Sequence, residues 1–119
     1  MKRILFFSVP LLVAFNLFAK EFYIDSGPNA QERLQEALIL IEEGDTLIIK
    51  SGYYKLEDGL SLDVDNVTVK GEGIDSTILD FKNQQSGAQG LLVTSDKVTL
   101  SDFSILDAKG DALKVIGAK

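Results

Sequence analysis

Aspartates that recur at similar places along the chain are the side chains best able to do chemistry in this sequence. One set consists of Asp80, Asp107 and Asp111, and a second consists of Asp63, Asp65 and Asp96. Hard cations need several converging oxygens, so the first set provides candidate Ca²⁺ ligands. The alternative is that aspartates at turns cap backbone amides, which is their ordinary role there. Neither set has the ligand spacing of a dedicated calcium-binding loop.

Three residue types are missing from the 119-residue chain, which contains no His, no Cys and no Trp. The absence of His and Cys excludes a Ser-His-Asp triad, a thiol nucleophile, the usual zinc sites and a disulfide framework. Any chemistry of these residues must therefore use carboxylates, Lys, Tyr or a hard metal ion. No cofactor is expected apart from Ca²⁺.

The N-terminal residues have the layout of a secretory signal peptide. Two basic residues precede an apolar run that ends at Phe18, and Ala19 and Lys20 then open a polar chain. The run is shorter than the roughly 20 residues that a membrane-spanning helix needs, and Pro10 interrupts it. We predict a signal peptide over residues 1–19, cleaved after Ala19, and an exported protein of the periplasm or the extracellular space.

The charge balance restricts the partners of the mature chain. The full sequence has a net charge of −6, from 12 basic and 18 acidic side chains. Cleavage after residue 19 removes two basic side chains and no acidic one, which lowers the net charge to −8. Such a surface repels polyanions, so nucleic acid and anionic membranes are not expected as partners. An anionic sugar polymer is disfavoured unless a cation bridges it to the protein.

One amphipathic helix is predicted at about Ala30–Glu43. Asn29 and Glu32 have the spacing of a capping box, and Gly44 is placed to end the helix. The apolar residues of this segment recur with helical spacing on one face, and they are Leu34, Ala37, Leu38 and Ile41. A helix of this kind can cover an apolar surface with one side only, so we expect it to cap the structure that follows.

The rest of the chain repeats itself. Four pairs of segments align at offsets of 20 to 31 residues. They are Gly59–Lys70 with Gly90–Ser101 (offset 31), Ile78–Asp80 with Ile105–Asp107 (27), Gly90–Val93 with Ala112–Val115 (22), and Leu47–Lys50 with Val67–Lys70 (20). The underlying unit has about 20–22 residues and three short strands, and the offsets differ because the turns differ in length.

A unit this short cannot bury its apolar side chains alone, so its copies must stack on one another. The alignment predicts two neighbouring columns of inward residues. They are Leu47, Val67 and Val98, and beside them Ile49, Val69 and Leu100. Strands of successive units would then pair in parallel around a narrow core. The predicted fold is an all-β solenoid, a right-handed parallel β-helix in which residues 20–119 form the cap, two full coils and part of another.

Several segments resemble the N-terminal region of pectate-lyase-like, right-handed β-helix repeat proteins. The similar segments are Glu43–Tyr54, Gly59–Leu62, Val67–Gly73 and Thr77–Asp80. The segment Gly110–Val115 also resembles the phrase Gly-Asp-Gly-Ile-x-Val that opens coils in that group, with Ala112 in place of the second Gly. The resemblance extends from Gln31 to Lys119 and implies the β-helix fold. The superfamily includes polysaccharide lyases, hydrolases, epimerases, sugar-binding proteins and adhesins, so no single activity is implied.

Lyases of that kind need a base that removes a proton next to a carboxylate, usually Arg, Lys or Tyr. Arg33 is the only Arg of the predicted mature chain, and it lies on the predicted helix. Three lysines lie on or beside predicted strands, where a solvated Lys is ordinary, and they are Lys70, Lys97 and Lys114. Tyr53 and Tyr54 follow the first repeat strand, and we expect one to pack under the helix and the other to lie on the surface. These residues do not assemble into an acid–base pair.

The predicted stacking implies that the repeat is interrupted at the C-terminal end of the chain. One 22-residue coil added to Val98 places the next inward residue at position 120, one beyond Lys119. A solenoid cut there would expose unpaired strand groups. We expect these residues to be the N-terminal part of a longer polypeptide, with a continuation of its own β-helix at this end.

Two functions are compatible with these features. The favoured one is an exported β-helix repeat module that binds a polysaccharide or acts as a scaffold, without a catalytic constellation in this segment. The alternative is the N-terminal part of a polysaccharide-active lyase, hydrolase or epimerase whose active site lies beyond Lys119.

Overall fold

The computed structural model describes residues 19–117, which form a mostly β structure with one helix. The strands are short and are joined by tight turns. The elements are β1 (Glu21–Ile24), α1 (Ala30–Leu40), β2 (Thr46–Ile49), β3 (Gly52–Lys55), β4 (Asp58–Leu62), β5 (Thr68–Lys70), β6 (Thr77–Asp80), β7 (Ser86–Val93), β8 (Thr99–Ser101), β9 (Ser104–Leu106) and β10 (Asp111–Val115). The predicted signal peptide, residues 1–19, lies outside the described residues except for Ala19.

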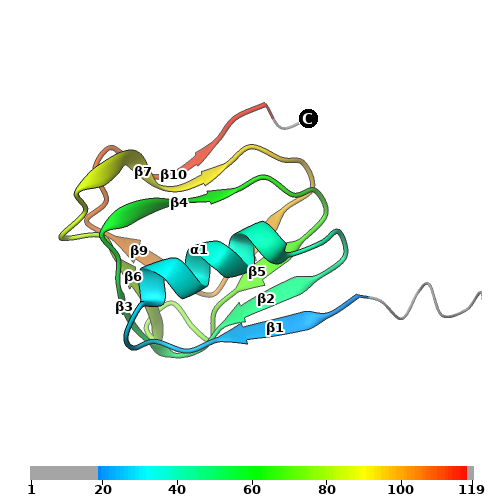
Figure 1. The fold of residues 1–119 in the computed structure, drawn as a ribbon, viewed down its shortest axis with the longest axis horizontal. Helices are drawn as coiled ribbons and strands as arrows, with labels where there is room; N and C mark the ends of the chain where they lie inside the picture. Colours follow the sequence, from blue (N-terminus) through cyan, green and yellow to red (C-terminus); the bar gives the residue numbers. More distant parts are fainter. Residues whose placement is uncertain (1–18, 118–119) are drawn as a thin grey trace, which may run out of the picture.

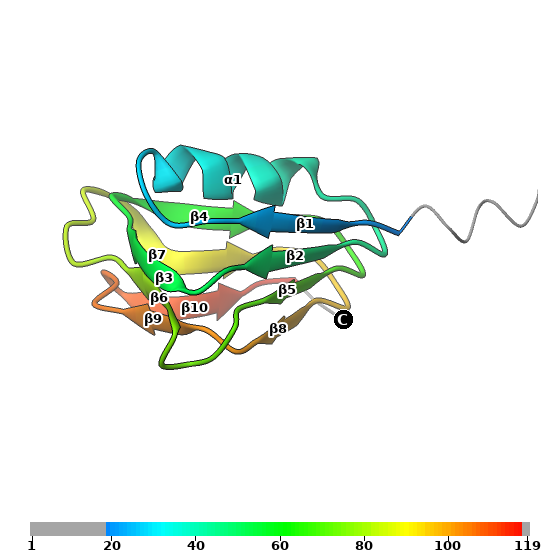
Figure 2. The same ribbon diagram turned by 90° about the horizontal axis from the view of Figure 1, so that it is seen from below.

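The strands form three parallel sheets whose members come from distant parts of the sequence. Their orders are β1-β2-β5-β8, β3-β6-β9 and β4-β7-β10. After α1 the chain therefore visits the three sheets in the same order three times. The sheets surround a common core with α1 across one end (Figure 1), and successive strands follow one another away from the helix (Figure 2). The prediction that strands of successive repeats pair in parallel is confirmed.

Two of the four repeat alignments match the strand pairing. Leu60 pairs with Leu91 at the offset of 31, and Leu91 pairs with Leu113 at the offset of 22. Leu60 and Leu91 are both buried, whereas Leu113, at the far end of the stack, is 43% exposed. The alignments succeed here because each of these positions keeps an apolar residue in the same column.

The offset of 20 is wrong by two residues. Leu47 pairs with Val69, an offset of 22, so the predicted columns that join Leu47 with Val67 and Ile49 with Val69 do not form. The predicted match of Val69 with Leu100 is confirmed. A shift of two leaves the buried face unchanged because side chains of a strand alternate with a period of two, and for this reason apolar pattern alone did not reveal the error.

The offset of 27 is wrong by one residue, and this shift does change which side chains face the core. Leu79 pairs with Ile105 and Asp80 with Leu106, so Asp80 is not stacked on Asp107. The repeated letters Ile-Leu-Asp suggested the other alignment. Burial decides against it, because Ile105 packs against the core beside Leu79 whereas Leu106 is 40% exposed.

Helix α1 is shorter than predicted and begins differently. It ends at Leu40, three residues earlier than expected, and Asn29 has a left-handed conformation (φ 60°) without a side-chain capping hydrogen bond. The capping-box prediction is therefore wrong. Arg33 fixes the chain that enters the helix, because its guanidinium donates to the carbonyl oxygens of Asp25 (2.9 Å) and Pro28 (3.1 Å).

The helix ends early because a turn built on Asp45 follows it. Ile41 is already extended and buried in the core. Asp45 accepts the amide of Glu42 on its side chain (3.0 Å) and donates its own amide to the Glu42 carbonyl (2.9 Å). Gly44 has a positive φ (92°) and donates to the carbonyl of Asn66 in the next repeat (2.7 Å). These bonds replace the last predicted helical turn.

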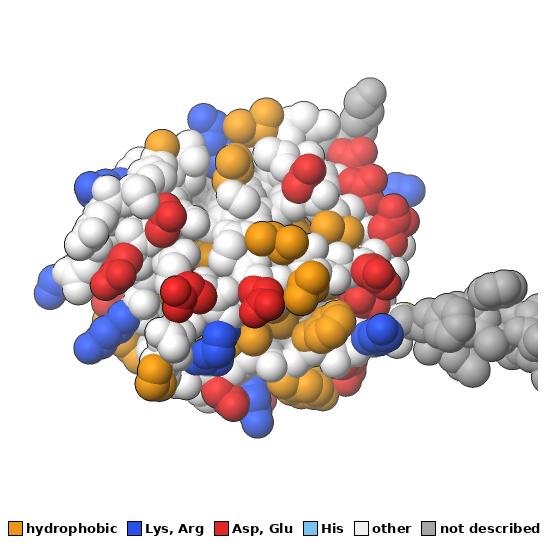
Figure 3. Space-filling view, viewed as in Figure 1, with side chains coloured by type: hydrophobic (Ala, Val, Ile, Leu, Met, Phe, Trp, Pro, Cys, Tyr) orange, Lys and Arg blue, Asp and Glu red, His pale blue; other side chains and the backbone are white. Residues whose placement is uncertain are grey.

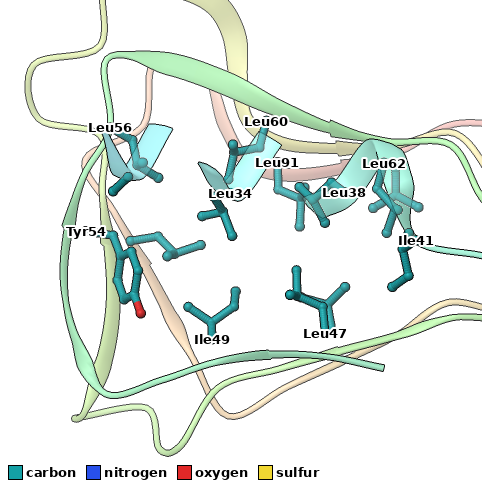
Figure 4. Packing of buried hydrophobic residues seen from close by; sticks show 14 of the residues in the cluster. Leu34, Leu38, Ile41, Leu47, Ile49, Tyr54, Leu56, Leu60, Leu62 and Leu91 are labelled. Atoms are coloured by element: carbon teal, nitrogen blue, oxygen red, sulfur yellow. The ribbon is translucent and has the colours of Figure 1, made fainter. Parts of the chain in front are cut away.

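The core lies between the helix and the three sheets. Leu34 and Leu38 of α1 point into it, toward side chains from all three sheets (Figure 4). The buried sheet residues among those shown include Leu47, Ile49, Tyr54, Leu60, Leu62 and Leu91. Burying a side chain of this size stabilises the fold by about 1.5–3 kcal/mol, so the helix is held by its packed face. Its outer side carries exposed Ile39 and Leu40, and hydrophobic side chains lie among acidic ones on this end of the molecule (Figure 3).

Two glutamines of α1 close the free edge of β4. The Gln35 side-chain amide donates to the carbonyl oxygen of Ser61 (3.0 Å) and accepts from the Ser61 amide (2.9 Å), as a neighbouring strand would. One turn earlier, Gln31 Oε1 accepts the amides of Glu57 and Asp58, both at 3.0 Å. Exposed strand edges invite pairing with other chains, and these contacts protect this edge.

The opposite end is open in the part of the chain that the structure describes. There β8, β9 and β10 are the last strands of their sheets, and β10 is exposed along its whole length. Apolar side chains at this end are 40–52% exposed, namely Leu106, Leu113, Val115 and Ile116. A hollow of about 370 Å³ at this end is lined mostly by apolar residues, including Leu100, Phe103, Ile105 and Leu113.

Two glycines allow the strands of the third sheet to approach closely. A Cβ on Gly59 would lie 2.7 Å from the carbonyl oxygen of Gln89, and one on Gly90 would lie 2.6 Å from that of Ala112. Ala112 takes the equivalent place in the last strand, where no further strand lies above it among residues 19–117. Within these residues, no helix is long and apolar enough to cross a membrane.

The edge-closing role of Gln35 is tested by replacing it with Ala. We expect Gln35→Ala to lower the free energy of unfolding by about 1 kcal/mol, because two backbone hydrogen bonds are exchanged for bonds to water. For a chain of this size that corresponds to a melting temperature about 4–8 °C lower. Thermal unfolding followed by circular dichroism measures it, with the exposed neighbour Glu36→Ala as control. Equal effects of the two substitutions would contradict the assignment.

Candidate functional site

A polar cavity of about 380 Å³ lies where β3 and β6 end side by side. The two strands are parallel, and Lys55 pairs with Asp80 at their last residues, so the turns that follow them meet at the same place. The cavity is lined by Tyr53, Lys55, Leu56, Glu57, Asp80, Lys82 and Asn83. Its walls therefore come from two successive repeats.

A tyrosine–carboxylate pair forms the centre of this cavity. The Tyr53 hydroxyl donates to Asp80 Oδ2 at 2.8 Å, and Asp80 Oδ1 accepts the backbone amide of Lys82 at 2.9 Å. Asp80 is only 8% exposed, whereas Tyr53 is 49% exposed, so the ring offers a face to solvent while its hydroxyl is held. The hydrogen bond to Asp80 raises the pKa of Tyr53 above its ordinary value. In this arrangement Tyr53 acts as a hydrogen-bond donor to Asp80.

The neighbouring tyrosine has a structural role. Side chains alternate along β3, and Tyr54 consequently points into the core with no exposed surface. Its hydroxyl lies 2.7 Å from the Lys50 carbonyl oxygen and 3.0 Å from that of Ile24. Burial raises the pKa of Tyr54 to about 12. The prediction that one of these tyrosines is buried and the other lies on the surface is confirmed.

Charged side chains of both signs surround the pair. The rim has three exposed charged side chains, namely Lys55, Glu57 and Lys82. Together with Asp80, the lining contains two ammonium groups and two carboxylates. Asn83 adds an amide with both donor and acceptor capacity. The cavity can thus form hydrogen bonds with a neutral polar molecule in several directions, and Asp107 adds a further negative charge near Tyr53.

The three calcium candidates are not stacked as the sequence predicts, although Asp107 lies near enough to Tyr53 to contribute to its raised pKa. Asp80 is committed to Tyr53 and to the Lys82 amide, Asp107 lies beyond β9 with a positive φ (56°), and Asp111 is exposed at the start of β10. Among residues 19–117 no three His, Cys, Asp or Glu side chains are grouped so that they could hold a metal ion. Calcium binding by Asp80, Asp107 and Asp111 stays a prediction, which titration calorimetry with Ca²⁺ would test directly.

The second set of aspartates bonds to the next repeat. Asp63 Oδ1 accepts the Thr94 hydroxyl (2.9 Å), and Asp65 Oδ1 accepts the backbone amide of Asp96 (2.8 Å). Both bonds join residues 31 positions apart, as the repeat alignment implies. The interpretation that these turn aspartates cap backbone amides is confirmed for Asp65, whereas Asp63 binds a side-chain hydroxyl.

The candidate bases lie apart from the cavity. Arg33 holds the loop before α1 by its two hydrogen bonds to backbone carbonyls. Lys70, Lys97 and Lys114 are exposed, on β5, in the turn before β8 and on β10 respectively. None of the four lines the cavity.

The pairing of Tyr53 with Asp80 was missed in the sequence. The two residues are 27 positions apart and share no motif, so the sequence offers Asp80 as a calcium candidate and Tyr53 as a core or surface residue, with nothing that links them. An alignment of Gly52–Lys55 with Thr77–Asp80 at an offset of 25 would have brought the two strand ends together. That offset was not among the repeats because the two segments have no residue in common.

Comparison of the chain with protein-family models, with curated proteins and with solved structures gave no match in any of the three.

The raised pKa of Tyr54 predicts how stability depends on pH. The folded protein keeps the phenolic proton up to about pH 12, whereas an unfolded chain releases it near pH 10. The contribution of the Tyr54 proton to the free energy of unfolding is therefore complete below pH 10 and is lost as the pH rises from 10 toward 12. Urea unfolding at a series of pH values should show this decline in the unmodified chain.

Tyr54→Phe provides the matched variant. It should be less stable at pH 8 by about 1–2 kcal/mol, because backbone carbonyl oxygens in the core lose their donor. It should also lose less stability between pH 10 and 12 than the unmodified chain. The same loss of stability over this range in Tyr54→Phe and the unmodified chain would show that Tyr54 does not govern it.

Proposed function

We propose that this chain is an exported, right-handed parallel β-helix module that binds a polysaccharide at the cavity between β3 and β6. The single observation that carries the proposal is the exposed ring of Tyr53, held by Asp80 and surrounded by Lys55, Lys82 and Asn83. Export, with removal of residues 1–19, belongs to the proposal and is supported by the sequence of that segment.

The β-helix assignment is supported by the order of the strands. The chain enters the three sheets in a constant order, and each return to a sheet adds a parallel strand next to the previous one. Crossover connections between parallel strands are right-handed in nearly all proteins, which favours the right-handed form. The similarity of the chain to the opening coils of pectate-lyase-like proteins supports the same assignment.

The chemistry of a sugar fits the cavity walls. A pyranose ring has an apolar C–H face, which can lie on an exposed aromatic ring, and a rim of hydroxyls that both donate and accept hydrogen bonds. Tyr53 supplies the ring, and the carboxylate, ammonium and amide groups supply partners for the hydroxyls. Because Asp107 adds a third carboxylate near Tyr53 and the mature chain carries a charge of −8, a neutral polysaccharide is favoured over an anionic one.

The open end supports the second candidate, an enzyme with a longer β-helix. Exposed strand edges and apolar side chains at β8, β9 and β10 are suited to a further coil of parallel strands, which could carry catalytic groups beyond Lys119. Ala112 affects how that coil would fit. Its Cβ stands where Gly59 and Gly90 allow close approach, so the next strand must lie farther away at this point.

Binding to immobilised polysaccharides in affinity electrophoresis tests the favoured proposal, using neutral glucans, xylan and galactan, and polygalacturonate with and without Ca²⁺. We expect a neutral polymer to retard the protein, and Tyr53→Ala to weaken its binding at least tenfold because the stacking face is lost. Tyr23→Ala is the matched control, since Tyr23 is an equally exposed tyrosine on β1, away from the cavity. The proposal would be contradicted if the protein bound none of these polymers, or if Tyr53→Ala bound as well as the unmodified chain. Release of unsaturated or reducing sugar ends would favour the enzyme.

A further inference from the structure

We propose that cleavage of the Ala19–Lys20 bond places the new α-ammonium group of Lys20 on the buried carboxylate of Asp45, so that processing locks the first strand onto its sheet. This inference rests on the proposed export and cleavage after Ala19, and it adds a residue that receives the new N-terminus. It does not depend on polysaccharide binding.

The geometry for this contact is already present. The backbone nitrogen of Lys20 lies 2.8 Å from Asp45 Oδ1, and Asp45 Oδ2 accepts the amide of Glu42 at 3.0 Å. The Lys20 carbonyl oxygen accepts the amide of Thr46 at 2.9 Å, which continues the pairing of β1 with β2. Asp45 is only 2% exposed, whereas Ala19 and Lys20 are exposed, so the bond to be cut lies at the surface.

The chemistry of cleavage changes this contact from neutral to ionic. A signal peptidase adds one water across the Ala19–Lys20 bond, which leaves a carboxylate on Ala19 and an amino group on Lys20. That amino group takes up a proton at neutral pH. The nitrogen that donated one neutral amide hydrogen then carries a positive charge and three hydrogens. Charge-assisted hydrogen bonds are about twice as strong as neutral ones.

The buried Asp45 carboxylate would be stabilised by the positive charge of the new N-terminus. Among residues 19–117, Asp45 forms no ion pair. The ion pair found within these residues joins Lys50 to Asp25 at the surface (3.9 Å). A buried carboxylate without an opposite charge is costly, and backbone amides compensate only in part. Within residues 19–117, strand β1 is also the edge of its sheet and pairs only with β2, so its beginning would fray without an anchor.

The first experiment identifies the product of export. The full chain is expressed with its own N-terminus in a bacterial host that exports it, and the exported product is analysed by intact mass and N-terminal sequencing. We expect a chain that begins at Lys20. A product that begins at another residue would overturn the inference together with the proposed cleavage site, whatever the outcome of the polysaccharide test.

The second experiment measures the coupling between cleavage and Asp45 in four proteins. These are the exported chain and the uncleaved chain, each with Asp45 and with Asp45→Asn, which keeps the size and a carbonyl acceptor but removes the charge. We expect Asp45→Asn to lower the melting temperature of the exported chain by at least 4 °C more than that of the uncleaved chain, corresponding to about 1 kcal/mol or a fivefold change in the unfolding equilibrium. Equal shifts would overturn the inference even if cleavage occurs at Lys20. Asp25→Asn, at the exposed ion pair, should give equal shifts in both.

A third measurement applies if the uncleaved chain does not fold. The α-amine of the exported chain is acylated near pH 7, where it is more reactive than lysine side chains, and the modified N-terminal peptide is quantified by mass spectrometry. An ion pair with Asp45 predicts acylation at least fivefold slower in the unmodified chain than in Asp45→Asn. Equal rates in the two proteins would show that the ammonium group does not lie on Asp45.

Discussion

The unpaired edge of a parallel strand is the constraint on which this structure depends. Backbone amides and carbonyls at an edge must find partners, and a short repeat can supply them only by stacking on another repeat. At the first end of the stack the chain meets this need for β2 and β4. Strand β1 pairs with β2, and the side-chain amides of Gln31 and Gln35 take the place of a strand beside β4. At the other end, β8, β9 and β10 offer their edges without a partner among residues 19–117.

The same stacking creates the candidate site. Tyr53 and Asp80 belong to different repeats and meet because β3 and β6 pair in parallel and end together. Neither side chain would be positioned in an isolated repeat. Asp80 is nearly buried and bonded on both oxygens, so it orients Tyr53 and holds its proton. The result is an exposed aromatic ring with polar groups around it, the arrangement on which the proposed sugar binding rests.

Much of the fold could be predicted from the sequence, because apolar periodicity and repeated segments depend on local pattern. Leu34 and Leu38 were correctly assigned to the buried face of the helix, and the offset of 31 was correct in two sheets. The errors arose where the pattern carries no information. A two-residue slip at Leu47 preserves the buried face, and the Ile-Leu-Asp repeat matched letters whose burial differs. The site itself depends on the exact pairing of β3 with β6, so it could not be derived until that register was known.

Formation of a disulfide between paired strands tests the stacked register most directly, and a chain without Cys gives it no background. Lys70 pairs with Ser101, and paired strands lie about 4.8 Å apart, within the range that a disulfide spans. Pairing of β5 with β8 in this register predicts that the Lys70→Cys, Ser101→Cys protein oxidises readily to a monomeric disulfide while it remains folded. The Lys70→Cys, Thr99→Cys protein, shifted by two residues, should oxidise much more slowly. Equal oxidation of the two proteins, or none in the first, would contradict the stacked arrangement.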